Sequence, residues 1–156
     1  MKRAMVFIIF MTLSFSLSAF ALGKPDFSGT WTLDTAKSDM GHGRSAPAAA
    51  KVTIVIKQTP AFLATTRNVG KDPETATHKL DGSESINKSP SGQDIRSTSR
   101  WEGQTLVTKS IMSTEHGSSE STFVRSLSAD GRVMTIDTTI KSSTGEIKQK
   151  LIYNKQ

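Results

Sequence analysis

The sequence predicts an all-β protein: a single antiparallel up-and-down β-barrel of about 8–10 strands, which follows an N-terminal signal peptide. Apolar and polar residues alternate with a period of two through most of the chain, which is typical of strands that bury one face. Turn signals that contain glycine, such as Asp81-Gly82, separate these runs about every 8–12 residues. Short hairpins between successive strands favour a meander, and closure into a barrel would remove its two exposed edges.

The segment KVTIVIKQTP shows the alternation most clearly. Val52, Ile54 and Ile56 fall on one face, β-branched residues dominate, and Pro60 ends the run. The same reasoning predicts strands over the following ranges: Gly29–Asp34, Val52–Gln58, Phe62–Asn68, Thr75–Leu80, Asp94–Trp101, Thr105–Met112, Ser119–Leu127, Arg132–Ile140 and Glu146–Tyr153.

One long connection interrupts the meander, TAKSDMGHGRSAPAAA from Thr35 to Ala50. A β-sandwich would need several long crossovers, so a single one favours a barrel. Connections of this length are uncommon in compact domains and act either as functional lids or as plain surface loops. Both interpretations stay open for this segment.

The start of the chain has the pattern of a cleaved export signal. Lys2 and Arg3 form a basic start, the apolar run that follows is too short to span a bilayer, and Ala19-Phe20-Ala21 matches the small-x-small cleavage pattern. We therefore predict a signal peptide over residues 1–21 and one β-barrel domain over residues 22–156. The style of the signal suggests a bacterial protein that is exported to the periplasm or the medium.

Composition and charge limit the partners. The chain has no cysteine, so packing and backbone pairing alone must stabilise the fold. Its net charge of +6 falls to about +4 without the signal, and the basic residues are scattered singly. Nucleic-acid binders gather their charge into a patch with interleaved aromatic residues. We expect no nucleic-acid partner, no stable membrane insertion after signal cleavage, and a monomer.

The chain resembles the calycin superfamily, whose best-known branches are the lipocalins and the fatty-acid-binding proteins. The matching features are Gly29-x-Trp31 on the first strand, the long first loop and the meander of hairpins. Weaker matches follow in order: Asp81-Gly82, RWEG at Arg100, LSADGR at Leu127, and Tyr153 on the last strand. The resemblance covers nearly all of the chain after the signal. It implies a bacterial secreted lipocalin-like barrel that binds a small amphipathic or hydrophobic molecule in its interior.

The resemblance also implies structural roles at the closed end of the barrel. Trp31 would plug this end beneath a basic side chain from near the C-terminus, in a cation–π contact. Gly29 would let the first strand bend at the barrel corner. The basic side chains available are Lys148, Lys150 and Lys155.

A carboxylate clamp of fatty-acid-binding relatives is not carried over. Those proteins grip the carboxylate with an Arg-x-Tyr pair on the last strand. Here Tyr153 follows Leu151, with no arginine two residues earlier. Fatty acid is therefore in doubt as the ligand.

Ligand contacts are expected from side chains that face the barrel interior. Hydrophobicity favours the inward face for Ile95, Trp101, Phe123, Leu127, Met134 and Ile136. An inward arginine is costly unless paired and would mark an anionic ligand. The arginines of interest are Arg67, Arg96, Arg100 and Arg125. The ligand-binding candidates are Arg96, Arg100, Arg125, Phe123, Met134 and Tyr153.

The other polar residues carry no catalytic or metal signature. The 18 serines and 18 threonines after the signal suit the outer face of strands, and only some are expected in a polar cavity. His42, His78 and His116 lie in or near loops and lack ligand spacing, so we expect no metal and no cofactor. A Gly-x-Ser-x-Gly elbow and a cysteine nucleophile are both missing.

Three functions stay open. The first is a noncatalytic carrier or sensor of a small amphipathic molecule. The second is a filled barrel that acts as an interaction or structural module of the cell envelope. The third is an isomerase-type enzyme, for which Asp137 is the only mid-strand acid to nominate, and which requires that acid to be buried.

Overall fold

The computed structural model describes residues 23–41, 51–69, 72–114 and 117–156. The predicted signal peptide lies outside them. The described residues form ten strands: β1 (Gly29–Leu33), β2 (Thr53–Gln58), β3 (Phe62–Asn68), β4 (Pro73–Lys79), β5 (Glu84–Lys88), β6 (Asp94–Glu102), β7 (Thr105–Thr114), β8 (Gly117–Leu127), β9 (Val133–Ser142) and β10 (Gly145–Lys155).

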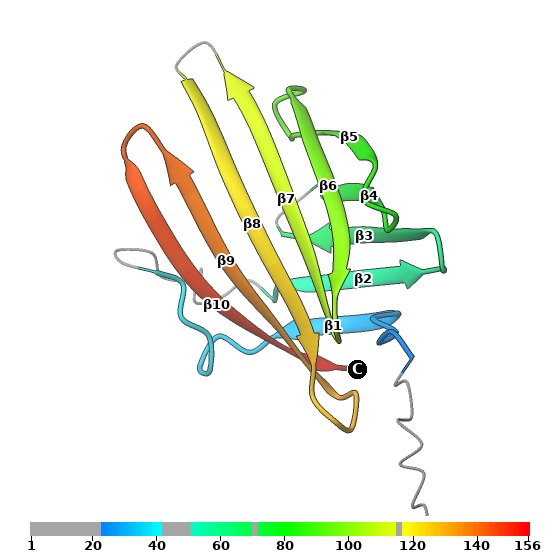
Figure 1. The fold of residues 1–156 in the computed structure, drawn as a ribbon. Helices are drawn as coiled ribbons and strands as arrows, with labels where there is room; N and C mark the ends of the chain where they lie inside the picture. Colours follow the sequence, from blue (N-terminus) through cyan, green and yellow to red (C-terminus); the bar gives the residue numbers. More distant parts are fainter. Residues whose placement is uncertain (1–22, 42–50, 70–71, 115–116) are drawn as a thin grey trace, which may run out of the picture.

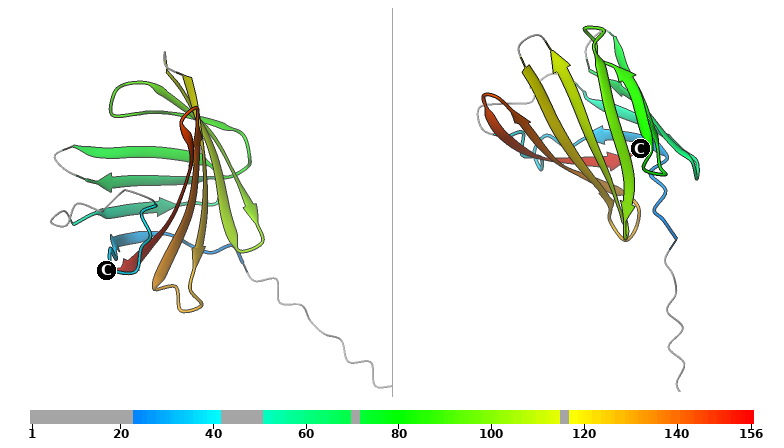
Figure 2. Two further views of the ribbon diagram at one scale, coloured as in Figure 1. Left: turned by 90° about the vertical axis from the view of Figure 1, so that its left-hand side faces the viewer. Right: turned by 45° about the horizontal axis from the view of Figure 1, so that its top comes forward.

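The strands form one antiparallel sheet in the order β4-β3-β2-β1-β10-β9-β8-β7-β6-β5. The first and last strands pair, with Trp31 opposite Lys155. The sheet wraps round, so that β1–β4 run across the steeply inclined β7–β10 (Figures 1 and 2). This confirms the predicted all-β, antiparallel up-and-down barrel. Among the described residues, no helix is long and apolar enough to cross a membrane.

The barrel is nearly closed, and side chains join its two edge strands. No backbone ladder links β4 to β5 in the described part of the chain. Instead, the Asn87 side chain accepts a hydrogen bond from the Thr77 amide at 2.8 Å and donates one to the Thr77 carbonyl at 3.1 Å. The Ser85 hydroxyl accepts a third hydrogen bond, from the Lys79 amide at 2.9 Å. These contacts satisfy backbone groups that an open edge would expose.

Strand β5 is the one element that the alternation does not predict. Its inward positions are polar, since Ser85 is buried and Asn87 is half-buried. Its one large apolar residue, Ile86, is 54% exposed. Polar residues therefore face inward and the apolar residue faces outward, the reverse of the usual strand pattern, so the sequence predicts a loop for this segment. The other nine ranges each locate a strand, with ends that differ by one or two residues.

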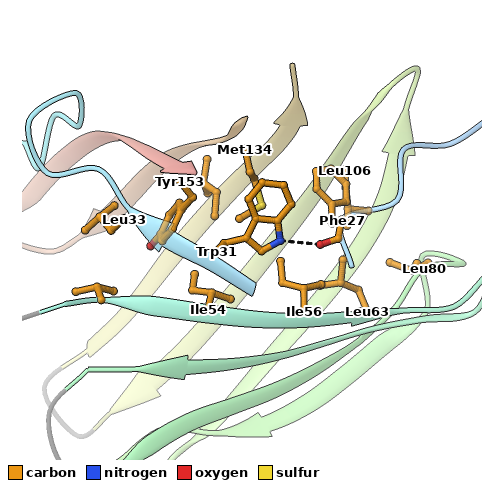
Figure 3. Close-up of a cluster of buried hydrophobic side chains, with 12 residues drawn as sticks. Phe27, Trp31, Leu33, Ile54, Ile56, Leu63, Leu80, Leu106, Met134 and Tyr153 are labelled. Carbon is orange, nitrogen blue, oxygen red and sulfur yellow. Dashed lines mark hydrogen bonds between the residues drawn. The ribbon is translucent and has the colours of Figure 1, made fainter. Parts of the chain in front are cut away.

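The apolar core lies at the end of the barrel where Trp31 sits (Figure 3). The Trp31 indole is fully buried, and its Nε1–H donates to the Phe27 carbonyl at 2.8 Å. The Phe27 ring stacks on Trp101, with ring centroids 6.0 Å apart. The other buried residues of this cluster are Leu33, Val52, Ile54, Ile56, Leu63, Leu80, Leu106, Met134, Ile136 and Tyr153.

Lys155 covers the Trp31 ring from the last strand. Its Nζ lies 5.2 Å from the ring centroid, within cation–π range, which selects it from the three lysines that the sequence offers. Gly29 has a φ of +137°, and a Cβ at this position would lie 2.8 Å from Lys155 Cε. The backbone conformation therefore favours glycine here, and a side chain would also displace the end of Lys155.

Candidate functional site

A cavity of about 700 Å³ lies above the core inside the barrel. Its size falls within the usual range for small-molecule sites. Much of its wall is apolar, from β2, β9 and β10, and it also contains two arginines. The lining residues are Met40, Ile54, Ile56, Thr65, Arg67, Glu74, Phe123, Arg125, Ile136, Thr138, Ile140, Gln149, Leu151 and Tyr153.

A second recess of about 290 Å³ adjoins the first. The two share Thr65, Arg67, Glu74, Phe123 and Arg125 in their walls, so they are neighbouring arms of one interior space. The second arm reaches toward the edge strands β4 and β5. Its wall includes hydroxyl groups from β7 and β8 beside apolar side chains such as Ile95 and Met112.

Arg125 on β8 lies where the two arms meet. The residue is only 8% exposed, and its Nη1 donates to the Thr108 hydroxyl at 3.1 Å. The guanidinium carbon lies 5.6 Å from the centroid of the Phe123 ring. Its Nε is buried and has no hydrogen-bond partner, and in the described residues no carboxylate pairs with Arg125. Burial lowers the pKa of Arg125 to about 10, so the side chain stays charged at neutral pH.

Tyr153 on β10 lies beneath the cavity, close to two cations. Burial raises the pKa of the Tyr153 phenol, while the charge of Arg67, its hydrogen bond with Arg67 and the charge of Arg125 oppose that rise. Arg67 also forms an ion pair with Glu74 at 3.2 Å. Arg67 therefore has a carboxylate partner, whereas Arg125 has none among the described residues.

His78 on β4 is buried in the wall of the second arm. Its Nδ1 lies 3.1 Å from the Ser97 hydroxyl. Burial, with a smaller contribution from the charge of Arg125, lowers the pKa of His78 from 6.5 to about 4. The ring is therefore neutral at pH 7. It lies one residue before the end of β4, within the predicted strand Thr75–Leu80 and near a turn as expected. His42 and His116 lie outside the described residues.

Two of the predicted ligand-binding arginines are in the wrong place for that role. Arg96 and Arg100 point to solvent from β6 and form ion pairs with Glu84 and Glu102, at 2.8 and 2.6 Å. The reason is the alternation of β6, in which neighbouring residues fill the interior face. Neither arginine lines the cavity.

Arg125, Phe123 and Tyr153 do line the cavity. Met134 is fully buried in the apolar core and does not line it. Ile95, Trp101, Phe123, Leu127 and Ile136 also face inward, as expected from their hydrophobicity. Asp137 is exposed on the outer face of β9, so it lacks the burial that an acid–base role inside the barrel requires.

Part of the long first connection also reaches the cavity. Met40 lines it, and the Met40 carbonyl accepts a hydrogen bond from Gln149 Nε2 at 2.8 Å. The backbones of Asp39 and Lys150 exchange two hydrogen bonds of 2.8 Å, which tie the connection to β10. Residues 42–50 lie outside the described residues, so the lid interpretation is not tested there.

Hydroxyl groups occupy more of the barrel interior than the sequence predicts. Serines and threonines were expected mainly on the outer face. However, the buried polar residues include Ser85, Ser97, Ser99, Thr108, Ser110 and Thr138. For the residues on β6, β7 and β9, the available signal was their position in the alternation, on the same faces as Ile95, Leu106, Met112 and Ile136.

The fold matches known barrels closely enough to compare. No family model matches the chain, and no curated protein matches its sequence. Solved structures do match, and each comparison covers 83% of this chain. One is a "REP1-NXSQ fatty acid transporter" (TM-score 0.61, 15% identity, 95% of that chain covered). Another is the zebrafish ileal bile acid-binding protein complexed with cholic acid (TM-score 0.62, 15% identity, 98% covered). A third is apo lipid binding protein 8 of Caenorhabditis elegans (TM-score 0.63, 13% identity, 95% covered).

These likenesses show the fold. At 13–15% identity they do not carry over a ligand. They agree with the expected single antiparallel β-barrel.

Proposed function

We propose that this chain is an exported, noncatalytic binding protein for a small amphipathic molecule with an anionic group. The observation that carries the proposal is Arg125, a buried cation in the cavity wall whose Nε has no hydrogen-bond partner among the residues that the structure describes. Burial of a charge is costly unless a counter-charge or hydrogen bonds compensate it. The anionic group of a ligand would supply both at this position.

The rest of the cavity suits an apolar body. Ile54 and Ile56 from β2 face the interior, together with Ile136 and Ile140 from β9 and Leu151 from β10. The printed names of the three matched structures also favour this ligand class, since they describe a fatty acid transporter, a bile acid-binding protein and a lipid binding protein. The open cavity counts against the filled-barrel alternative, and the exposure of Asp137 counts against the isomerase alternative.

An Arg125→Met variant tests the proposal, because methionine keeps much of the side-chain volume and removes the charge. Binding of palmitate and of hexadecanol is measured by displacement of a fluorescent probe. We expect palmitate to bind at least about tenfold more weakly to the variant, since hydrogen bonds to charged groups contribute about 1.5–3 kcal/mol. Hexadecanol should lose little.

The matched control is Arg100→Met, which removes an arginine from the outer face. It should bind palmitate as the wild type does. Circular dichroism establishes that both variants fold. Equal palmitate affinity in folded Arg125→Met protein and wild type would refute an anion site at Arg125.

Export is proposed from the first 21 residues. Expression of the full chain in a bacterium, followed by fractionation and N-terminal sequencing, should give a periplasmic or secreted protein that starts at Leu22. A cytoplasmic protein that retains Met1 would contradict the proposal.

A further inference from the structure

A row of four serines crosses the interior wall of the barrel. Ser85 on β5 lies opposite Ser97 on β6, Ser97 lies opposite Ser110 on β7, and Ser110 lies opposite Ser121 on β8. Ser85, Ser97 and Ser110 are buried, and Ser121 is half-buried. Interior positions of a small barrel are normally filled by larger apolar side chains. This row therefore both leaves space and offers hydroxyl groups.

The two halves of the row differ in how their hydroxyl groups are used. Ser85 accepts the hydrogen bond from the Lys79 amide across the β4–β5 edge, and Ser97 contacts His78. These two serines serve the fold. Ser110 and Ser121 line the second arm of the cavity, and their hydroxyl groups make no hydrogen bond with another described residue.

Further unpartnered polar atoms lie on the same side of the cavity. Thr138 Oγ1 on β9 is buried in the wall of the first arm and has no hydrogen-bond partner in the described part of the chain, and the same holds for Arg125 Nε on β8. Ser110 and Ser121 extend this set onto the neighbouring strand β7. Polar groups that lack partners thus lie on three adjacent strands, β7 to β9. The part of the wall that comes from β2 is apolar through Ile54 and Ile56, and β9 adds Ile136 and Ile140 beside Thr138.

We infer that the ligand is polar along one face: an anionic molecule whose body carries hydroxyl or carbonyl groups on the side turned toward Ser110, Ser121 and Thr138, and whose remaining surface is apolar. This inference rests on the proposed function and specifies its ligand class. A plain saturated chain would leave Ser110, Ser121 and Thr138 without partners, and an unsatisfied buried hydroxyl is costly. A ligand with hydroxyl groups on one face satisfies them while its other face stays in apolar contact.

Two steroid acids test the inference, because they share a skeleton and a carboxylate. Cholate carries hydroxyl groups on one face, and 5β-cholanate has none. The affinity of each is measured by probe displacement, below the concentration at which either forms micelles. The measured quantity is the ratio of the two affinities. The ratio cancels any general effect of a variant on binding.

The test variant is Ser110→Ala/Ser121→Ala, which removes the two free hydroxyl groups of a directly opposed pair. The control variant is Ser113→Ala/Ser118→Ala, a directly opposed pair on the outer face of the same two strands. In the Ser110→Ala/Ser121→Ala variant, we expect the preference for cholate over cholanate to fall about tenfold, which corresponds to the loss of two ordinary hydrogen bonds. In the Ser113→Ala/Ser118→Ala variant, the preference for cholate should equal that of the wild type.

The outcomes separate this inference from the proposed function. One outcome is that both acids bind with an affinity that depends on Arg125, but that the ratio is the same in Ser110→Ala/Ser121→Ala and in the wild type. This outcome refutes a ligand with one polar face and leaves the anion site at Arg125 in place. If neither acid binds and Arg125→Met has no effect on palmitate, the proposed function itself fails.

Discussion

The buried His78 makes the stability of the fold depend on pH in a range where few other groups titrate. Its pKa falls from 6.5 to about 4 in the folded chain, because burial and the charge of Arg125 disfavour the imidazolium. Between these two values the unfolded chain binds a proton at this residue and the folded chain does not. Stability rises with pH wherever the unfolded state binds more protons. The contribution of neutral His78 is therefore complete above pH 6.5 and is lost as the pH falls toward 4.

The size of the loss follows from the two pKa values. One pKa unit corresponds to about 1.4 kcal/mol. With 6.5 and about 4 for the unfolded and folded states, the free energy of unfolding should fall by about 2 kcal/mol between pH 8 and pH 5, and by about 3 kcal/mol at pH 4. The carboxylates whose pKa values are lowered, such as Asp81 and Asp130, lose their contributions only at lower pH, below about 3.8.

The assay is urea unfolding followed by tryptophan fluorescence at a series of pH values from 8 to 4.5. Trp31 is buried in the core, so its emission reports the loss of packing. The comparison is His78→Gln, in which the side chain stays neutral throughout and can still reach Ser97. We expect the pH dependence of the wild type to exceed that of the variant by about 2 kcal/mol at pH 5.

The absolute stability of His78→Gln does not matter to this test. A variant that is less stable at every pH still reveals whether the difference from wild type changes with pH. If the two curves run parallel from pH 8 to pH 4.5, His78 titrates alike in folded and unfolded chains, and its burial as described is wrong.

Two further predictions concern the base of the barrel and its open edge. Trp31→Ala should lower the free energy of unfolding by about 3–5 kcal/mol, because it removes a large buried side chain. Lys155→Met removes an exposed cation–π contact and should lower it by about 0.5–1 kcal/mol. Urea unfolding measures both values, and a similar cost for the two variants would contradict the plug role of the indole. Asn87→Ala should speed hydrogen exchange of the Thr77 amide about tenfold or more, because that amide has no ladder partner on β5. The control is Asn68→Ala, which removes a side-chain hydrogen bond between β3 and β2, two strands that are already paired by a backbone ladder. The backbone amides near Asn68 should keep their exchange rates.

The fold was predictable because alternation and turn chemistry agree along most of the chain. In β6, Ser97 and Ser99 alternate with exposed residues and lie on the same face as Ile95 and Trp101. One apolar residue at each end thus fixes the face of the whole strand. β5 lacks such a marker, because its single isoleucine faces solvent. Where the interior itself is polar, hydrophobicity gives no signal, and only the register with neighbouring strands places the residues.

The same logic explains which arginines were assigned well. Arg125 shares its face of β8 with Phe123 and Leu127, so its inward position follows from alternation. Arg96 and Arg100 lie on the face opposite Ile95 and Trp101, so alternation already placed them outside. The pairing of Arg67 with Glu74 on the next strand could not be read from the sequence, because it depends on the register of β3 against β4. The ion pair with Glu74 matters, because it distinguishes Arg67 from Arg125, which has no carboxylate partner in the described part of the chain.

The barrel separates stability from recognition along its length. At the base, Trp31, Phe27 and their neighbours bury apolar surface and satisfy the indole N–H, so every group there stabilises the folded chain without a ligand. Above it, Arg125 Nε and Thr138 Oγ1 are buried without a hydrogen-bond partner among the described residues, and Ser110 is buried in the same interior. Under the proposed function, these groups cost stability in the unliganded protein and are compensated when a molecule of matching polarity binds. Buried polar groups that lower the stability of the unliganded protein are expected where selection acts on binding. Residues of a binding site can therefore be recognised by missing hydrogen-bond partners as well as by their contacts.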